Sequence, residues 1–346
     1  MIITRTPYRI TLGGGGTDLP SFYREHGGFV FTMSINKYMY IILQRRSVAD
    51  RKYFIRYSQV EVADSIDEIK HGLVRETLRM HNMTEYMEIT SIADLPARTG
   101  LGSSGSYLVG LLNAVHAYKQ DPVGPAQIAE EACKIEMDIL KEPVGKQDQY
   151  IASFGGFKTL EIDRAGKVTV QSVPVDFVTA MELAGKARMY YTGVQRSASA
   201  VLKSQDQAAM TPRHPDHARV MDSLAYIKDL GYHIKKSFEN RDLDAFGRQL
   251  DEHWQHKRRM SAGISLTAVD QLYEEVKKRF NVLGGKIIGA GGGGFLFLYC
   301  PEHGNGLDEY MSANQMPRVN YFPSLQGSKV ISDMTAFDDF SPIAKP

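Results

Sequence analysis

The chain has 346 residues, 43% of them hydrophobic and 10% aromatic, so it can bury a large core and divide into two lobes. Lysine and arginine total 41 against 40 aspartates and glutamates, which leaves no broad basic face for nucleic acid. The two cysteines lie among apolar residues, as free thiols do in a reducing cytoplasm. No segment has the roughly 18 apolar residues of a membrane span. We therefore expect a cytoplasmic protein that acts on small molecules.

The first half of the chain is rich in predicted strands. Alternating side chains and turn residues predict strands over residues 2–12, 29–34, 38–43 and 87–92, followed by a hairpin of residues 157–162 and 168–173. Helices are expected from a capping box at residue 65 to about residue 81, after the glycine-rich segment 95–106, and over residues 125–140. A polar connection over residues 142–149 follows.

The second half alternates fewer strands with longer helices. Its predicted strands are residues 187–192, 286–288 and 295–300, and its predicted helices are residues 198–209, 217–239, 243–258 and 268–280. The irregular stretch that begins near Val173 is taken as the lobe boundary. The expected class is α+β, with lobes of residues 1–175 and 176–346.

Residues 95–106 join a glycine-rich turn to hydroxyl side chains at the start of an apolar helix. The free N–H groups and the positive dipole end of that helix predict an anion site. Gly100, Gly102 and Gly105 fit the dinucleotide-binding pattern, but residues 95–99 separate them from the preceding strand, which disfavours a dehydrogenase. A Walker loop is excluded, because no Gly-Lys pair is followed by Ser or Thr.

A second cluster, residues 13–18, has four consecutive glycines before Thr17 and Asp18. Absent side chains let a ligand approach the backbone, and the hydroxyl and carboxylate can bind sugar hydroxyls. Arg9 stands just before this loop, although a lone arginine in a strand is usually a surface residue.

Phosphoryl transfer requires a phosphate cradle, a divalent metal, a cation and a carboxylate for the attacking hydroxyl. Glu136 and Asp148 flank one turn and are the candidate carboxylates. Position alone favours a solvated helix face for Glu136 and a functional role for Asp148. The histidine pairs His214 with His217 and His253 with His256 lack a third ligand, so no zinc site is expected.

Together the clusters resemble the GHMP kinase superfamily, which includes galactokinase, homoserine kinase and mevalonate kinase. Residues 6–18 resemble its first motif, residues 96–106 its second and residues 289–294 its third, in the family's order. The resemblance implies a two-lobed fold, with an N-terminal lobe like domain 2 of ribosomal protein S5 and a ferredoxin-like C-terminal lobe. It also implies ATP and Mg²⁺ as cofactors.

The resemblance further implies a role for each matching residue. Asp148 corresponds to the catalytic aspartate, and Arg9 to the basic residue that lowers the pKa of the sugar hydroxyl or stabilises transferred charge. Glu136 and Ser104 correspond to the metal ligands, which overturns the solvated interpretation of Glu136. The implied nucleotide-binding residues are Pro96, Gly100, Leu101, Gly102, Ser103, Ser104, Gly105 and Ser106.

The first motif narrows the range of sugars that the resemblance implies as substrates. Gly15 and Gly16 stand where galactokinases have a Glu-His pair, so contacts to galactose are not inherited. Residues 13–23 are similar to the branch that phosphorylates the anomeric hydroxyl of D-glycero-α-D-manno-heptose 7-phosphate. The implied substrate-binding residues are Gly14, Gly15, Gly16, Thr17, Asp18 and, for the 7-phosphate, Arg98, Lys146 and Arg196.

Other interpretations stay open at this point. An L-fucokinase has a similar loop, a GHMP-fold sensor would bind sugar and ATP without turnover, and ordinary surface charge accounts equally well for Arg98, Lys146 and Arg196. The expected partners are ATP and a sugar phosphate, with no nucleic acid and no membrane. A homodimer remains possible. The branch implies a role in making nucleotide-activated heptose for bacterial surface polysaccharide.

Overall fold

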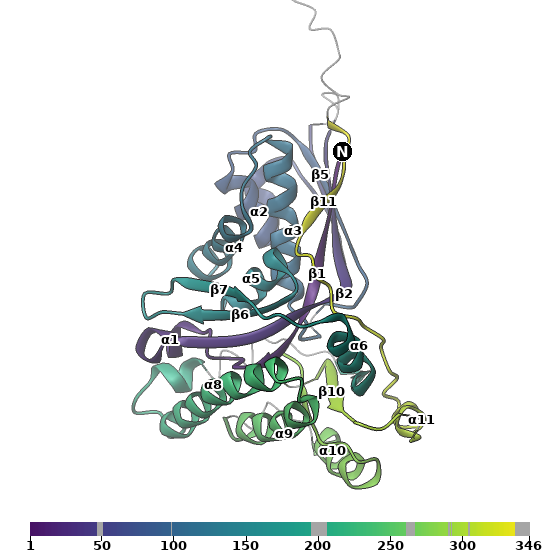
Figure 1. Cartoon of the computed structure of the whole chain (residues 1–346). Helices are drawn as coiled ribbons and strands as arrows, with labels where there is room; N and C mark the ends of the chain where they lie inside the picture. Colours follow the sequence, from purple (N-terminus) through teal and green to yellow (C-terminus); the bar gives the residue numbers. More distant parts are fainter. Residues whose placement is uncertain are drawn as a thin grey trace, which may run out of the picture.

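The computed structural model describes residues 1–46, 51–97, 99–194, 206–260, 267–289, 291, 293–303 and 305–335. Two sheets organise the chain (Figure 1). The larger sheet contains β1 (Ile2–Gly13), β2 (Gly28–Arg45), β3 (Tyr53–Arg56), β4 (Val60–Ala63), β5 (Met87–Ala93), β6 (Phe157–Ile162), β7 (Val168–Ser172) and β11 (Lys329–Asp333). The smaller sheet contains β8 (Ala187–Tyr191), β9 (Gly284–Ile287) and β10 (Phe295–Tyr299).

The long strand β2 is one element where the sequence predicts two. It pairs with β6 through residues 28–33 and with β5 through residues 39–45, while β1 runs antiparallel along most of its length. The register between β1 and β2 shifts after Pro7, where a residue without an N–H group interrupts the ladder. The one strand β2 therefore pairs with different neighbours in the two halves of the larger sheet.

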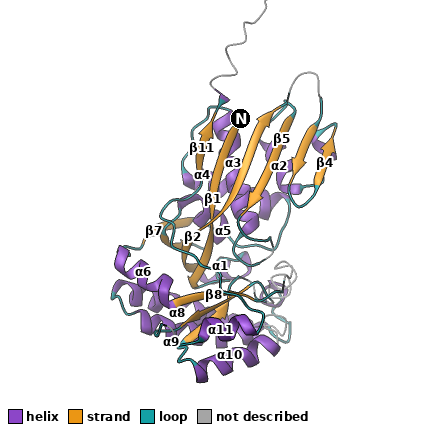
Figure 2. Cartoon of the chain, turned by 90° about the vertical axis from the view of Figure 1, so that its right-hand side faces the viewer, coloured by secondary structure: helices purple, strands orange, loops and turns teal. Residues whose placement is uncertain are grey.

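Four helices cover one face of the larger sheet: α2 (Gly72–Met80), α3 (Ser103–Tyr118), α4 (Pro125–Cys133) and α5 (Gln147–Phe154), as Figures 1 and 2 show. Thr4 and Thr6 of β1 are fully buried beneath α3. A Cβ on Gly110 of α3 would lie 2.8 Å from Oγ1 of Thr6. Glycine at this position therefore lets α3 pack close to the sheet.

Two predicted helices differ in the structure. The helix expected over residues 125–140 is α4 followed by a π-helical turn, η2 (Lys134–Ile139), and the one expected from residue 65 is a short turn, η1 (Ile66–Glu68), followed by α2. The predicted connection at residues 142–149 ends early, because α5 begins at Gln147. Asp148 therefore lies in the first turn of a helix.

The smaller sheet has the order β8-β10-β9, and residues 317–319 bond to the free edge of β8 through the backbone atoms of Met189 and Tyr191. These residues form an isolated bridge to β8, so the described smaller sheet has three strands. The remaining helices are α1 (Pro20–His26), α6 (Phe177–Lys186), α8 (His217–Glu239), α9 (Leu243–Met260), α10 (Thr267–Arg279) and α11 (Leu307–Ala313). None of the helices in the described ranges is both long and apolar enough to span a membrane.

One hydrophobic core joins the two lobes. It contains Ile10 of β1 together with Phe238, Phe246 and Tyr299 of the second half. The last described strand, β11, was assigned from sequence to the second lobe but pairs with β1 in the larger sheet. The division after residue 175 stays a prediction, and the predicted helix 198–209 falls largely outside the described residues.

Candidate active site

The three glycine clusters meet between the lobes. Gly100 and Gly289 both have a φ of +83°, and a Cβ on Gly100 would lie 2.3 Å from the carbonyl oxygen of Ile288. A Cβ on Gly294 would lie 2.2 Å from the carbonyl oxygen of Thr99. The second-motif loop thus rests on the third-motif turn, and only glycine fits at these contacts.

Arg9 of β1 forms two hydrogen bonds with Asp148 of α5. Its Nε donates to Oδ1 of Asp148 at 2.7 Å and its terminal nitrogen donates to Oδ2 at 3.0 Å. Another guanidinium N–H donates to the carbonyl oxygen of Gly100. The Arg9 side chain is 6% exposed, against 24% for Asp148, so the pair is accessible from the side of the carboxylate. This two-point contact fixes the carboxylate beside the second-motif loop.

Asp18 holds the start of the helix that carries Asp148. Its Oδ2 accepts from the backbone N–H of Gln147 at 3.0 Å, and its Oδ1 accepts from that of Gly16 at 3.2 Å. A Cβ on Gly145 would lie 2.0 Å from Oδ2 of Asp18, so glycine is required there as well. Burial raises the pKa of Asp18, while the hydrogen bond from Gln147 opposes the rise. The first motif therefore positions α5.

Glu136, on the π-helical turn, is buried at 2% exposure. Burial raises the pKa of its carboxyl to about 7, against hydrogen bonds from Gln149 and Ser104 that lower it. The solvated helix face favoured by position alone is therefore wrong. Ala132 and Cys133 lie four and three residues before Glu136 and are also buried, so the helical repeat places it on the apolar stripe.

A cavity partly open to solvent brings many of these residues together. The predicted site residues that line it are Arg9, Gly15, Gly16, Asp18, Gly100, Gly102, Ser103, Ser104 and Asp148. Those that do not line it are Gly14, Pro96, Leu101, Gly105, Ser106, Thr17, Glu136 and Lys146. Arg98 and Arg196 lie outside the described residues.

Three predicted residues form contacts within the fold instead. The hydroxyl of Thr17 donates to the carbonyl oxygens of Gly14 and Phe29, and that of Ser106 donates to the carbonyl oxygen of Pro7. The ammonium of Lys146 donates to Glu130 and to the carbonyl oxygen of Gly166. These polar groups stabilise the loops around the cavity.

Three basic residues of the cavity were not among the predicted site residues: His253 and Lys257 of α9, and Lys286 of β9. The sequence pattern contains features that could have indicated these three residues. His253 and Lys257 are four residues apart on one face of a helix whose other buried residues are apolar, and Lys286 lies in a short strand before the third motif. The sequence analysis considered His253 only as a metal ligand.

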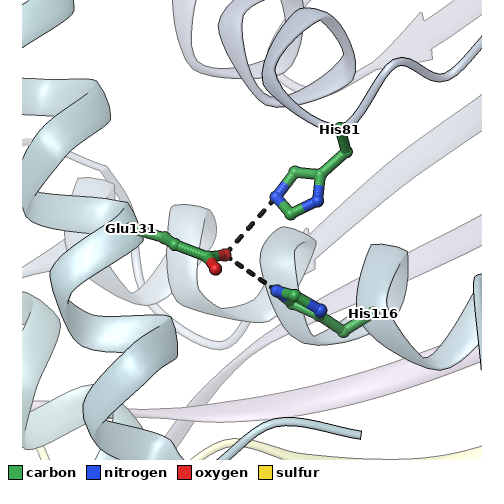
Figure 3. A group of neighbouring side chains, drawn as sticks. All are labelled: His81, His116 and Glu131. Atoms are coloured by element: carbon green, nitrogen blue, oxygen red, sulfur yellow. Dashed lines mark hydrogen bonds and ion pairs between the residues drawn. The ribbon is translucent and has the colours of Figure 1, made fainter. Parts of the chain in front are cut away.

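A further group of titratable side chains lies outside this cavity (Figure 3). Nε2 of His116 lies 2.8 Å from Oε2 of Glu131, and Nε2 of His81 lies 3.4 Å from the same oxygen. Gln127 donates to the other carboxylate oxygen at 2.9 Å. The carboxylate is thus shared by two imidazoles and an amide, and it joins the ends of α2 and α3 to α4.

Comparison with known families agrees with this geometry. The GHMP kinases N terminal domain matches residues 68–156, and the GHMP kinases C terminal domain matches residues 234–314. The first match includes the second-motif loop, Glu136 and Asp148, and the second includes His253, Lys257, Lys286 and the third motif. Both lobes therefore contribute to the similarity.

Among curated proteins, the chain is similar to the D-glycero-alpha-D-manno-heptose 7-phosphate kinase of Campylobacter jejuni, with 26% identity over 308 residues that cover 86% of this chain and 89% of the relative. It is also similar to the L-fucokinase/L-fucose-1-P guanylyltransferase of Bacteroides fragilis, with 23% identity over 86% of this chain and 34% of that protein.

Solved structures share the fold. A D-glycero-D-manno-heptose 1-phosphate kinase from Bacteroides thetaiotaomicron superposes with a TM-score of 0.76 and 21% identity, covering 96% of this chain and 99% of the other. Lactococcus lactis galactokinase superposes with a TM-score of 0.72 and 19% identity, covering 95% and 94%. The arrangement of both lobes is common to all three.

Proposed function

Because this chain belongs to the GHMP kinase family, we propose that it transfers the γ-phosphoryl group of ATP to the anomeric hydroxyl of D-glycero-α-D-manno-heptose 7-phosphate. The observation that carries the proposal is the pair of Arg9 and Asp148 beside the second-motif loop, within one cavity. The similarity to a heptose 7-phosphate kinase over most of both chains supports this sugar over L-fucose. The products are ADP and heptose 1,7-bisphosphate.

Asp148 is the group that acts on the sugar hydroxyl. Its carboxylate, held by Arg9, accepts a hydrogen bond from the anomeric O–H and aims that oxygen at the γ-phosphorus. The new bond joins the C1 oxygen to phosphorus, and the bond between phosphorus and the β,γ-bridging oxygen breaks. The hydroxyl proton passes to Asp148, and Arg9 offsets charge near the transferred group.

The second-motif loop is the proposed triphosphate site. Gly102 at the N-cap of α3 has a left-handed backbone, and Ser103 and Ser104 follow in the first helical turn. The free N–H groups at this end of α3 donate to phosphate oxygens, and the helix dipole favours their negative charge. The predicted nucleotide-binding residues that do not line the cavity would support the loop.

The residues around Glu136 fit the Mg²⁺ ion that the family implies. Glu136 is a buried carboxylate, and no described ion pair supplies it with a cationic partner. The side-chain oxygen of Gln149 next to it is also buried and accepts no hydrogen bond within the described part of the chain. Glu136 and Ser104 would hold the ion through oxygen ligands. An Mg²⁺ ion held there would supply positive charge to neutralise the phosphates during transfer.

A substrate panel tests the proposal. ADP release is measured with heptose 7-phosphate, unphosphorylated heptose, L-fucose, D-mannose and D-galactose, and ³¹P NMR locates the new phosphate ester. We expect turnover to be fastest with heptose 7-phosphate and the new ester to be at C1. Equal or faster turnover with L-fucose would overturn the substrate, and tight sugar binding without turnover would indicate a sensor.

Two finer proposals follow from the same resemblance. A cytoplasmic enzyme of this kind would supply nucleotide-activated heptose for bacterial surface polysaccharide, and two chains would associate as a homodimer. Fractionation of the producing cells and light scattering of the purified protein test the location and the oligomeric state.

A further inference from the structure

The floor of the cavity is formed by three basic side chains from the second lobe. His253, Lys257 and Lys286 are 1%, 7% and 2% exposed, and all three line the cavity that contains Asp148. We call them the basic floor. They lie on α9 and β9, whereas the second-motif loop and Asp148 belong to the first lobe.

The basic floor has no acidic partner within the described ranges. The ammonium of Lys257 donates to the carbonyl oxygen of Gly289, and that of Lys286 donates to the carbonyl oxygen of Leu12 at 3.3 Å. Neither lysine forms an ion pair there, and each ammonium has two further N–H donors. Both ring nitrogens of His253 are buried without a hydrogen-bond partner.

In the protein without a bound ligand, burial disfavours the charged forms of these three side chains. Burial, followed by the charge of Arg9, lowers the pKa of Lys257 to about 8, although the charge of Asp18 opposes this fall. Burial, with the charges of Lys257 and Arg9, lowers the pKa of Lys286 well below its usual range. Burial, with the charges of Lys286 and Lys257, does the same to His253. Burial without an acidic partner disfavours the charged form of each group, and an anion bound beside them would favour that form again.

The carboxylates that line the cavity already accept hydrogen bonds from other protein groups. Both oxygens of Asp148 accept from Arg9, and both oxygens of Asp18 accept from backbone N–H groups. An anion on the basic floor would therefore come from a ligand. A phosphate monoester suits it, since it carries nearly two negative charges and three acceptor oxygens.

We propose that His253, Lys257 and Lys286 bind the phosphate ester that the sugar substrate already carries. This inference rests on the proposed function and deepens it. The carbonyl oxygen of Leu12, which Lys286 contacts, precedes the first-motif glycines Gly15 and Gly16 in the cavity wall. A sugar held against those glycines would have one end at Asp148 and its phosphate on the basic floor. Of the residues expected from sequence to bind this phosphate, Lys146 donates to Glu130 and Gly166 instead, while Arg98 and Arg196 lie outside the described residues.

Kinetics with two sugars test the proposal. Lys257→Met and Lys286→Met are compared with the wild type on heptose 7-phosphate and on unphosphorylated heptose. Each variant should lower kcat/KM for the phosphorylated sugar by about 10- to 100-fold, the loss of one charge-assisted hydrogen bond. The KM for ATP and kcat/KM for the unphosphorylated sugar should stay within about twofold, and Lys286→Arg should restore part of the preference.

The control is Lys278→Met, since Lys278 is an exposed lysine of α10. It should leave all parameters unchanged. An equal loss with both sugars would indicate a structural role and overturn the proposal. A raised KM for ATP with an unchanged preference between the sugars would assign the floor to the nucleotide.

Stability gives a second readout that does not depend on activity. Because methionine removes a buried amine that no acidic side chain pairs with and keeps most of the volume, Lys286→Met should raise the melting temperature of the ligand-free protein. Titration calorimetry with inorganic phosphate, carried out with a non-hydrolysable ATP analogue bound at the second-motif loop, should show binding to the wild type and none to Lys286→Met. Phosphate binding of equal strength in both would overturn the proposal. If wild type phosphorylates no sugar but binds phosphate in this way, the proposed function fails and the anion site stands.

Discussion

At the scale of single residues, Arg9 and Asp148 show why residue type matters as much as charge. The guanidinium reaches both carboxylate oxygens and the carbonyl oxygen of Gly100 at the same time. A lysine ammonium is a point charge on a flexible chain and cannot hold the plane of the carboxylate through two parallel bonds. The orientation of Asp148 therefore depends on arginine at position 9.

Asp148→Asn should reduce kcat for sugar phosphorylation by about 10²- to 10⁴-fold, because the amide cannot take up the hydroxyl proton. Binding of a fluorescent ATP analogue should be nearly unchanged. Asp222→Asn, at an exposed position of α8, is the control and should keep wild-type kcat. Full activity of Asp148→Asn would remove Asp148 from the mechanism.

The imidazole and carboxylate group of Figure 3 should make stability depend on pH. The hydrogen bond to Glu131 raises the pKa of His116. Burial alone would raise the pKa of Glu131, but hydrogen bonds from His116 and His81 hold it well below its usual range. The His116 contribution is complete below its unfolded pKa, and it is lost as pH rises through the raised folded pKa. The Glu131 contribution is complete above its unfolded pKa, and it is lost as pH falls through the lowered one.

Urea unfolding at several pH values measures this effect. The free energy of unfolding of the wild type should fall between pH 6 and pH 8 by more than that of His116→Gln. Glu131→Gln should lose about 1–3 kcal/mol near pH 6, where both charged groups contribute. Identical pH profiles for wild type and His116→Gln would show that this pair contributes nothing to folding.

At the scale of elements, the contact between glycine loops should tolerate no side chain. Gly100→Ala places a Cβ against the Ile288 carbonyl and forces alanine into a left-handed backbone. It should destabilise the protein by about 1–3 kcal/mol and lower kcat/KM for ATP. Gly124→Ala is the matched control, because a Cβ there meets no atom within 4 Å and φ is −76°. That variant should lose only a few tenths of a kcal/mol.

Local sequence patterns predicted most of the regular elements. The strands β1, β5 and β10 and the helices α8, α9 and α10 agree with the predictions to within a few residues. The break expected in β2 was wrong, because pairing with different neighbours along its length is a tertiary effect. The start of α5 was missed because Asp18, more than a hundred residues away, satisfies the N–H group of Gln147. Side-chain capping from a distant loop leaves no local pattern.

The candidate site was predicted in part. The first glycine cluster stands out in the sequence because four consecutive glycines exceed what a turn requires, and Asp148 stands out because it lies in a polar segment beside Gly145. The metal-binding role that the family resemblance implies for Glu136 stays a prediction, while its burial follows from the helical repeat. The same helical repeat places His253 and Lys257 on the buried face of α9, whereas the burial of Lys286 depends on the packing around β9.

At the scale of the whole molecule, β11 should contribute to the stability of both lobes. A chain that ends at residue 328 exposes the β1 edge that pairs with Lys329–Asp333. Its melting temperature should fall by at least about 5 °C, since the lost ladder covers buried residues of the larger sheet. A chain that ends at residue 335 keeps β11 and is the control. Equal melting temperatures in a thermal scan would contradict a stabilising role for β11.

The course of the backbone also limits how the lobes can move. The chain leaves the larger sheet after β7, builds the smaller lobe, and returns to pair as β11 beside β1. The smaller lobe is thus an insertion tied to the larger one at two points, near residues 173–176 and 320–328. The packing of α8 on β1 and β2 and the hydrophobic core that both lobes share add to these two connections. The basic floor and Asp148 are therefore held at a fixed separation across the cavity.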